Sequence, residues 1–248
     1  MISVIVIAYN EEHYLPVLLD CLLAQTWRDF EVIVVDSGSS DRTREVARAY
    51  EGRFQAFSLL DLGCINGPGY ARNRGAERAR HERLLFLDSD TVVDRGFLER
   101  AVAALKRFRA DVASCLIRVP GADLKARIGA FLLNTLMVLL QPVYVTAYGA
   151  CLFSTRAVHH AVGGFREHLG ICEDCEYVKR ARQSLRCRYR ILPMTFGTSD
   201  RRARSEGAMR LMMKYLRVHA YRMLSRREIP KGTVVYEYGD HHEARPGA

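Results

Sequence analysis

Two aspartates, Asp88 and Asp90, directly follow the apolar run 84–87, which reads Leu-Leu-Phe-Leu. Such a run predicts a buried strand, and side chains two residues apart on a strand point to the same side. Two carboxylates at the exposed carboxyl end of a strand suit Mg²⁺ or Mn²⁺, and such a cation can neutralise a diphosphate. Because the same spacing is also typical of a solvated turn, other segments must support a metal site.

Polar residues also end two earlier apolar segments. Residues 2–7 and 30–35 are rich in Val and Ile, which predicts parallel strands covered on both faces. Asn10 follows the first strand and Asp36 ends the second. Strand and helix patterns alternate four times, and ligands of such parallel sheets bind beyond the carboxyl ends of the strands. We therefore expect these residues and the aspartate pair to meet at one edge, although Asn and Asp also serve as caps and turn formers.

Helical patterns lie between and after these strands. The apolar period in residues 15–22 predicts a helix capped by Asn10 or a neighbour, and further helices are expected at 43–50 and 71–80. Strands are expected at 54–60 and 148–155, and a short helix at 156–162. A last helix opens with Glu173 and Asp174 and runs to about residue 183. Helix capping alone would explain this acid pair, because carboxylates are stabilised at a helix N-terminus.

The composition permits a full core and divides the charge unevenly. With 248 residues and 49% hydrophobic content, the chain suits one large α/β domain or two small ones. Residues 1–100 hold 12 basic and 16 acidic side chains, whereas residues 101–248 hold 25 and 12, so the formal charges are −4 and +13. The basic second half indicates an anionic partner, which is phosphate, nucleic acid or an anionic membrane surface.

Three features of the sequence bear on where in the cell the protein is located. The seven cysteines are odd in number and scattered, which indicates a reducing compartment rather than a disulfide framework. A strand pattern begins at Ile2, so no cleaved export signal is expected. Residues 128–145 carry no charge, but polar residues and Pro142 interrupt them, and a membrane span needs about 20 apolar residues. We expect a buried or interfacial helix there, and a cytoplasmic protein.

Five segments together resemble the family 2 glycosyltransferases, which are inverting nucleotide-sugar enzymes of the GT-A fold. The segments are SVIVIAYNEEHYLP at the start, VIVVDSGSSDRT at 32–43, GYARNRGAERA at 69–79, LLFLDSD at 84–90 and YGACLFSTRAVHHAVGGFREHLGICEDCEYVKRA at 148–181. The resemblance implies an α/β fold with a Rossmann-like, mostly parallel sheet and helices on both faces. It also implies a catalytic domain over 1–200, with a nucleotide-binding half (1–100) and an acceptor-binding half (101–200), before a basic extension (201–248).

The resemblance implies a site for a nucleotide-sugar donor. Asp36 would contact the nucleobase with Arg72 nearby, and Asp88 would approach the ribose. Asp90, together with Asp88, would hold the Mn²⁺ or Mg²⁺ that bridges the diphosphate. UDP-sugars are favoured, since the Asp36 and Arg72 pairing resembles uridine-binding members, while guanosine and thymidine donors stay open. The predicted donor-binding residues are Ala8, Tyr9, Asn10, Glu11, Asp36, Arg72, Asp88, Ser89 and Asp90.

By the same resemblance, Asp174 aligns with the general base. Inversion requires a base opposite the leaving diphosphate, which takes a proton from the acceptor hydroxyl. Glu173 would orient the acceptor or raise the pKa of Asp174 by like-charge proximity. Arginines in the following loop are candidates for binding phosphate or the acceptor, namely Arg201, Arg202 and Arg204.

Some features stay outside this pattern. No third metal ligand is clear, although His219, His241 and His242 are candidates. A rival zinc site would use His168, Cys172, Cys175 and Cys187, but a second closely spaced Cys pair is missing. A redox Cys-x-x-Cys motif is also disfavoured, because the same segment matches the catalytic motif of the family. No Gln-x-x-Arg-Trp motif of processive polysaccharide synthases is present, which implies a single-transfer enzyme.

The basic extension contains an amphipathic pattern in residues 206–227. Apolar residues gather on one side of the expected helix (Met209, Met212, Met213, Leu216, Ala220 and Met223), and Arg210, Lys214 and Arg217 lie roughly opposite. The pattern suits a surface helix packed on the domain, a helix on a membrane surface or, less well, a nucleic-acid-binding helix.

These features favour a metal-dependent inverting glycosyltransferase. It would act at the cytoplasmic face of a membrane on a lipid-linked or cell-envelope glycan acceptor, attached peripherally to the anionic surface. The alternatives are a nucleotidyltransferase of similar fold, which would not need Asp174 as a base, and a non-catalytic basic module for nucleic acid.

Overall fold

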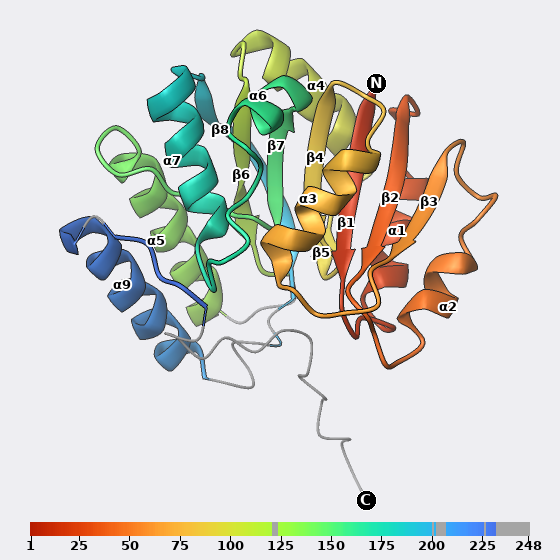
Figure 1. The fold of residues 1–248 in the computed structure, drawn as a ribbon. Helices are drawn as coiled ribbons and strands as arrows, with labels where there is room; N and C mark the ends of the chain where they lie inside the picture. The colour runs from red at the N-terminus through yellow and green to blue at the C-terminus, as the bar shows by residue number, and fades with distance from the viewer. Residues whose placement is uncertain (121–123, 200, 202–206, 226, 232–248) are drawn as a thin grey trace, which may run out of the picture.

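A computed structural model describes residues 1–120, 124–199, 201, 207–225 and 227–231 of the protein. These residues form one eight-stranded sheet in the order β3-β2-β1-β4-β7-β6-β8-β5 (Figure 1). Its strands are β1 (Ile2–Ala8), β2 (Phe30–Asp36), β3 (Phe57–Asp61), β4 (Arg83–Asp88), β5 (Thr91–Val92), β6 (Val112–Arg118), β7 (Cys151–Thr155) and β8 (Tyr189–Thr198). The helices are α1 (Leu15–Leu23), α2 (Thr43–Arg48), α3 (Pro68–Arg78), α4 (Phe97–Arg107), α5 (Leu124–Leu140), α6 (Arg156–Ala161), α7 (Glu173–Leu185) and α9 (Ala208–Ser225).

The sheet is parallel where strands and helices alternate along the chain. Strands β1, β2, β3 and β4 pair in parallel, as do β6 and β8. Strand β7 lies between β4 and β6 and is antiparallel to both, and β5 is antiparallel to β8. The predicted mostly parallel α/β fold is therefore confirmed. The reversed direction of β7 and the strands β5, β6 and β8 were not predicted from the sequence pattern.

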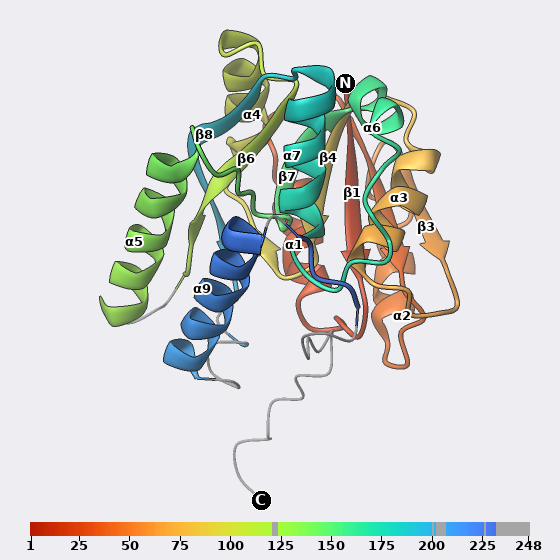
Figure 2. The ribbon, with the colours of Figure 1, turned by 60° about the vertical axis from the view of Figure 1, so that its left-hand side comes forward.

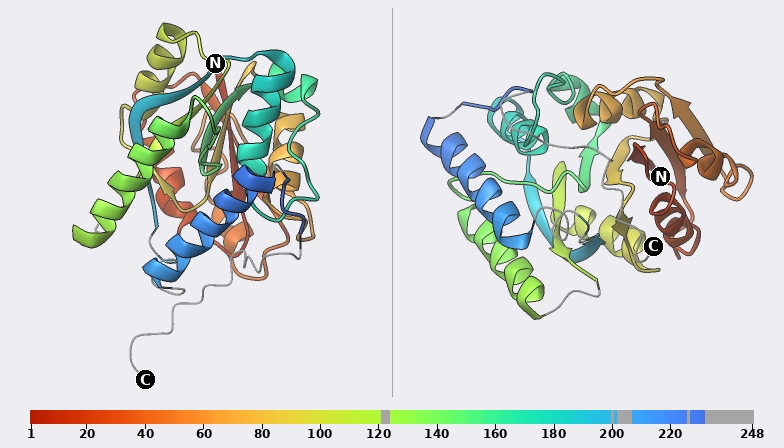
Figure 3. Two further views of the ribbon diagram at one scale, coloured as in Figure 1. Left: turned by 90° about the vertical axis from the view of Figure 1, so that its left-hand side faces the viewer. Right: turned by 90° about the horizontal axis from the view of Figure 1, so that it is seen from below.

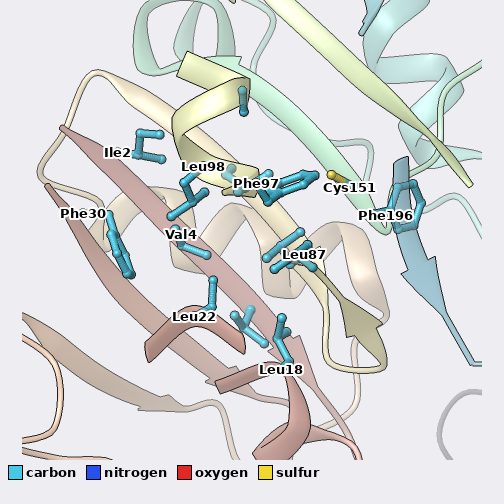
Figure 4. Close-up of a cluster of buried hydrophobic side chains, with 14 of the residues drawn as sticks. Ile2, Val4, Leu18, Leu22, Phe30, Leu87, Phe97, Leu98, Cys151 and Phe196 are labelled. Atoms are coloured by element: carbon cyan, nitrogen blue, oxygen red, sulfur yellow. The ribbon is translucent and has the colours of Figure 1, made fainter. Parts of the chain in front are cut away.

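Helices cover both faces of the sheet, as Figures 1 and 2 show. One core cluster joins α1 and α4 to the sheet through residues such as Leu18, Phe97 and Leu87 (Figure 4). The other joins α3, α6 and α7 to the opposite face, and includes Phe86 and Tyr177. Consecutive residues of β4 thus belong to different clusters, because strand side chains alternate between the two faces.

Some predicted boundaries shift. Helix α1 begins at Leu15, not near Asn10, and Pro16 occupies its first turn, where its missing N–H costs no hydrogen bond. Asn10 has φ 54° and lies in the loop before the helix, so it is not a cap. Strand β7 begins at Cys151, three residues later than the predicted start, which leaves Gly149 in the preceding loop.

The apolar stretch around residues 128–145 forms most of α5. Of the two predicted alternatives, a buried or an interfacial helix, the fully buried one is wrong. Phe131 is 67% exposed and Leu139 is 70% exposed, whereas Met137 is 5% exposed. Only one side of α5 therefore packs on the domain. Among the described residues, no helix has the length and hydropathy needed to cross a membrane.

Candidate functional site

The parallel strands bring the predicted polar residues to one edge of the sheet. Ala8 at the end of β1 lies opposite Asp36 of β2, and Ile7 lies opposite Asp88 of β4. We call this edge, formed by the carboxyl ends of β1, β2 and β4, the strand-end site. The expected convergence of three distant segments is a direct result of this register.

The loops after β1 and β2 hold each other in place. Asn10 donates its backbone N–H to Ser39 Oγ (2.9 Å), and its side-chain Oδ1 accepts the N–H of Ser40 (2.9 Å). Glu11 donates its backbone N–H to Thr43 Oγ1 (2.7 Å). The left-handed conformation of Asn10, which Asn tolerates better than most residues, allows this exchange. Asn10 therefore shapes the site through its loop.

Asp36 is fully buried beneath the loop that follows β2. Its Oδ2 accepts the N–H groups of Gly38 (3.1 Å) and Ser39 (3.0 Å), and its Oδ1 accepts the Ser39 hydroxyl (2.5 Å). Gly38 has φ 77°, and a Cβ there would lie 2.8 Å from the backbone nitrogen of Cys64. Asp36 thus fixes the loop geometry, and its contact with a nucleobase stays a prediction. Ala8 and Ser89 are buried and Tyr9 is half-buried at the same edge.

Asp88 and Asp90 face different partners. Strand β4 ends at Asp88, so Asp90 lies in the turn before β5 and the two-residue strand period does not apply to it. Asp88 Oδ1 accepts a hydrogen bond from Arg72 Nη2 (2.8 Å). Asp90 Oδ2 accepts the hydroxyl of Ser199 (2.6 Å) at the end of β8. The two carboxylates therefore connect the strand-end site to two separate parts of the fold.

Arg201 carries a positive charge into the site from the loop after β8. It donates from Nη1 to Glu11 Oε2 (2.7 Å) and from Nη2 to Glu11 Oε1, and its Nη2 lies 3.8 Å from Asp90 Oδ2. Burial raises the pKa of Glu11 to about 7, and Arg201 only partly opposes this effect. Asp88 and Asp90 also raise it, so the three acids form one negative cluster. Arg202 and Arg204 lie outside the described residues.

The strand-end acids fit a hard divalent cation. Asp88 and Asp90 supply carboxylate oxygens, and Arg201 already places a cationic group beside Asp90. Among the residues described, no group of three or more His, Cys, Asp or Glu side chains is arranged to hold a metal. A Mg²⁺-type ion is often held by one or two carboxylates together with substrate phosphates, so two protein ligands suit a cation that arrives with a diphosphate.

The same result argues against the other metal sites considered. His168, Cys172, Cys175 and Cys187 are all described and do not form a zinc-binding group. His219 instead shares a hydrogen bond through Nδ1 with the Tyr144 hydroxyl (3.0 Å). His241 and His242 lie outside the described residues.

Arg72 joins the carboxyl end of β4 to the acid pair of α7. It donates from Nη2 to Asp88 and from Nη1 to Glu173 Oε1 (2.5 Å), while its Nε has no hydrogen-bond partner. Arg72 is 2% exposed; burial disfavours its charge, but Asp88 and Glu173 outweigh this and raise its pKa. Burial raises the pKa of Glu173, against the opposing effect of Arg72. The predicted position of Arg72 beside the nucleobase stays untested, and its guanidinium is held by these two acids.

Asp174 lies in the first turn of α7 and is held by two backbone donors. Its Oδ2 accepts the N–H of Gly149 (2.6 Å), and its Oδ1 accepts the N–H of Cys175 (2.7 Å). A Cβ at Gly149 would lie 3.0 Å from both Asp174 Oδ2 and Arg72 Nη2. The missing side chain of Gly149 thus leaves room for Asp174 beside Arg72. Glu173 is joined to the strand-end site through Arg72, and the role of Asp174 as a general base stays a prediction.

Sequence reasoning missed Gly149 and Asn73. Asn73 donates from Nδ2 to the Phe165 carbonyl (3.0 Å) and accepts the Phe165 N–H at Oδ1 (2.8 Å), which fixes the loop before α7 to α3. A buried Asn inside a helix is a signal of such a role, because Asn is a poor helix former. For Gly149 the sequence offers no comparable signal, since its neighbours in space come from distant segments.

Helix α9 packs on the helix that carries the acid pair. Val218 and Ile229 share a buried cluster with Cys172 and Cys175, which flank Glu173 and Asp174 in sequence. Arg222 is also buried, and donates to Glu228 Oε2 (2.6 Å). The basic helix is therefore part of the support of α7.

Comparisons with known proteins agree with this arrangement. The sequence profile described as "Glycosyl transferase family 2" matches residues 3–143. Among curated relatives, the Staphylococcus aureus poly(ribitol-phosphate) beta-N-acetylglucosaminyltransferase TarS is 36% identical over 124 residues, which is 49% of this chain and 21% of TarS. The Haloferax volcanii glycosyltransferase AglE is 30% identical over 187 residues, which is 73% of this chain and 60% of AglE.

Solved structures show the same fold. The UDP complex of S. aureus TarS residues 1–349 has a TM-score of 0.64 at 24% identity, over 80% of this chain and 60% of that one. The mannosyltransferase PcManGT of Pyrobaculum calidifontis, in complex with GDP-Man and Mn²⁺, has a TM-score of 0.68 at 24% identity, over 87% of this chain and 64% of that one. The chain thus spans between a fifth and two thirds of the length of these proteins. Its fold is that of the GT-A neighbours, and the match over more than half of its residues shows that the chain belongs to glycosyl transferase family 2.

Proposed function

We propose that this protein is a metal-dependent inverting glycosyltransferase that moves a sugar from a nucleotide sugar to an acceptor hydroxyl. The observation that carries the proposal is the bridge through Arg72, which connects Asp88 at the strand-end site to Glu173 beside Asp174. A donor group bound at the strand ends and a base acting on an acceptor would thereby share one site. UDP-sugars are the favoured donors, in keeping with the UDP bound by the structural relative TarS.

The chain's own residues suffice for the acid–base part of the reaction. Asp174, fixed by the N–H groups of Gly149 and Cys175, would take the proton of the acceptor hydroxyl. The acceptor oxygen would then form a bond to the anomeric carbon, while the bond to the diphosphate breaks and its electron pair leaves with the nucleoside diphosphate. A divalent cation held by Asp88 and Asp90 would stabilise the negative charge on that leaving group.

We further propose that the acceptor is a cell-envelope or lipid-linked glycan and that the protein attaches peripherally to the cytoplasmic face of a membrane. The name of the relative TarS refers to a poly(ribitol-phosphate) acceptor, which supports an envelope polymer. The basic helix α9 supports an anionic surface as a partner. Nucleotidyl transfer and nucleic-acid binding are disfavoured by membership of the family, and neither would need the base that we propose for Asp174.

A donor screen followed by product analysis tests this function. The protein would be incubated with Mn²⁺ and UDP-, GDP- or dTDP-sugars, and the melting temperature recorded, because a ligand that binds only the native state raises it. The donor that stabilises the fold would then be offered with amphiphilic and soluble acceptors, and the anomeric configuration of the product read by NMR. We expect inversion relative to the donor. A product that retains the donor configuration, or a nucleotidylated product, would contradict the proposal.

A further inference from the structure

Helix α5 packs on the domain by one side and leaves a continuous apolar face uncovered on the other. Met137 is buried, and Asn134 is fixed by hydrogen bonds with both the N–H (3.0 Å) and the carbonyl (2.8 Å) of Ile117. The opposite side carries apolar side chains that are 43–70% exposed, namely Leu124, Ile128, Phe131, Leu132, Leu133, Leu136, Val138 and Leu139. An exposed apolar area of this kind on a soluble domain indicates an interaction surface.

Helix α9 has the same two-sided character. Its inner side carries the buried residues Val218 and Arg222. Its other sides carry apolar side chains that are 42–81% exposed, namely Met213, Leu216, Tyr221, Met223 and Leu224. The methionine-rich face predicted from the sequence is therefore not the face that packs on the domain; the side chains of Met209 and Met212 lie outside the described part.

The two helices are neighbours. Tyr144, four residues after α5, shares a hydrogen bond with His219 of α9 and accepts one from Arg222 Nη1 (2.9 Å). All ribbon views place α5 and α9 side by side (Figures 1, 2 and 3). Their lower ends in Figure 1 project beyond the sheet on the side toward which β1 and β4 point, which is the side of the strand-end site.

The charge on both helices has one sign. The 17 residues of α5 and the 18 residues of α9 contain no Asp or Glu, whereas they contain Lys125, Arg127, Arg210, Lys214 and Arg217 in addition to the buried Arg222. A lipid surface with anionic headgroups matches this combination, because apolar side chains enter the acyl boundary while Lys and Arg reach the headgroups. The two helices themselves offer no acidic side chain that could pair with a cationic residue of a second protein.

We propose that α5 and α9 together form a docking surface for an anionic bilayer, with α5 as the main inserted element. The docking surface lies next to the strand-end site, and α9 contacts the cysteines that flank Glu173 and Asp174. Docking would therefore present Asp174 to a hydroxyl carried by a membrane lipid, so that the acceptor is amphiphilic. The membrane attachment and this last clause rest on the proposed function, whereas the assignment of α5 as the main inserted element rests on its exposed apolar side chains.

Vesicle sedimentation tests the docking surface with the full chain. We compare the parent with Phe131→Glu/Leu139→Glu and with a control, Val17→Glu/Leu185→Glu, which adds the same charge at exposed apolar positions of α1 and α7. The vesicles contain phosphatidylcholine with or without phosphatidylglycerol. The α5 variant is expected to lose at least about tenfold in apparent affinity for anionic vesicles, since two apolar anchors become anions, while the control stays within about twofold. Equal pelleting of the α5 variant and the parent would overturn the proposal.

A fluorescence experiment fixes which side enters the lipid. The experiment uses a Trp27→Phe background, which removes the single native tryptophan. On addition of anionic vesicles, the emission maximum of the tryptophan introduced by Phe131→Trp should shift to shorter wavelength, and brominated lipids should quench its fluorescence. The tryptophan introduced by Val17→Trp should show neither change. An unquenched Phe131→Trp, or a concentration-dependent dimer of the parent that Phe131→Glu/Leu139→Glu abolishes, would assign this face to another partner.

The same variants distinguish failure of docking from failure of the proposed function. Calorimetric binding of UDP with Mn²⁺ is measured without vesicles, so it reports the donor site alone. Normal donor binding with no vesicle binding would overturn docking, and with it the proposed membrane attachment, and would leave the proposed sugar transfer in place. Vesicle binding without any nucleotide binding would leave docking in place and remove the proposed function.

Discussion

At the scale of single residues, the site depends on buried charges that hold one another. Arg72 is 2% exposed and contacts two acids from different elements, Asp88 of β4 and Glu173 of α7. Glu11 and Arg201 form a second pair near Asp90. Removing one partner of a buried ion pair leaves the other charge uncompensated and typically costs about 3–5 kcal/mol. Substitutions that test ligand binding or catalysis without unfolding the protein should therefore avoid Arg72 and change Asp90 or Asp174.

We expect Asp90→Ala to abolish Mn²⁺-dependent nucleotide binding while the fold survives. Asp90 lies in a turn and contacts the Ser199 hydroxyl, so its loss removes little packing. Isothermal calorimetry with UDP and Mn²⁺ measures the effect. Asp94→Ala is the matched control, because Asp94 is an exposed acid on the same segment that pairs with Arg100. Unchanged Mn²⁺-dependent binding by the Asp90 variant would remove Asp90 from the metal site.

For Asp174→Asn we expect donor affinity within a few-fold of the parent and a transfer rate lower by about 10² or more, the usual scale for a lost general base. The amide can keep a carbonyl acceptor toward Gly149, so the local structure is preserved while the proton acceptor is lost. Single-turnover transfer and calorimetric donor binding separate the two effects. Transfer at the parental rate would make Glu173 the next candidate base.

At the scale of elements, the fold positions the site by close packing of α3 and α7 on the sheet. Gly75 of α3 sits directly against β1, since a Cβ there would lie 2.3 Å from Ile5 Cγ2. His159 of α6 fills the space between Phe86, Phe165 and Tyr177, and its Nδ1 has no hydrogen-bond partner. Gly75 and His159 thus control how closely α3 and α6 approach the strands that end at the strand-end site.

We predict opposite effects of the same substitution at two helical glycines. Gly75→Ala should destabilise the protein by about 1–3 kcal/mol through overpacking against Ile5. A Cβ at Gly129 in α5 would have no other atom within 4 Å. Gly129→Ala should therefore stabilise the protein by up to about 1 kcal/mol, because Ala is the better helix former. Urea denaturation gives both free energies of unfolding. A Gly75→Ala variant as stable as the parent would contradict the close approach of α3 to β1.

Acidification should destabilise the fold through His159. Burial, with Arg180 and His160, lowers the pKa of His159 from 6.5 to about 4. The unfolded chain therefore binds the proton first as the pH falls, and stability is lost between pH 6.5 and about 4. From the linkage relation, the loss on going from pH 7.5 to 5 is on the order of 2 kcal/mol. His159→Phe should reduce this pH dependence of the free energy of unfolding, measured in urea; an unchanged slope would exclude His159 as its source.

At the scale of the whole molecule, charge and apolar surface are concentrated beside the acidic strand-end site. Residues 101–248 carry the formal +13, and α5 and α9 expose most of the large apolar side chains on the surface that is described. The acidic cluster and the basic helices thus face different ligands, a metal-bound diphosphate and an anionic surface under our proposals. Long-range attraction of this kind falls with ionic strength.

The triple change Arg210→Glu, Lys214→Glu and Arg217→Glu should release the protein from anionic vesicles at low salt. Each cation near an anionic leaflet contributes about 1 kcal/mol, and each glutamate adds repulsion. Raised salt should release the parent only in part, because the apolar face of α5 is insensitive to screening. Transfer to a soluble acceptor analogue should persist. Co-sedimentation decides the matter, and equal recovery of parent and variant in the pellet would contradict a role for these three cations.

The sequence by itself determined five of the strands, namely β1, β2, β3, β4 and β7, together with the order of their polar ends and the family. Continuous Val, Ile and Leu runs can only be satisfied in a sheet covered on both faces, so the strand-end positions of Asp36 and Asp88 followed from local pattern. The helix with Glu173 and Asp174 in its first turn was also predicted, in keeping with the preference of carboxylates for a helix N-terminus.

The tertiary structure alone decided the contacts between these segments. Arg72 and Glu173 are 101 positions apart, and Arg201 and Glu11 are 190 apart, so no local pattern records either pairing. The same holds for the uncovered side of α5, because an apolar helix of one composition is buried or exposed according to what packs beside it. Local periodicity fixes which side of an element is apolar, and only the assembled fold decides whether anything covers that side.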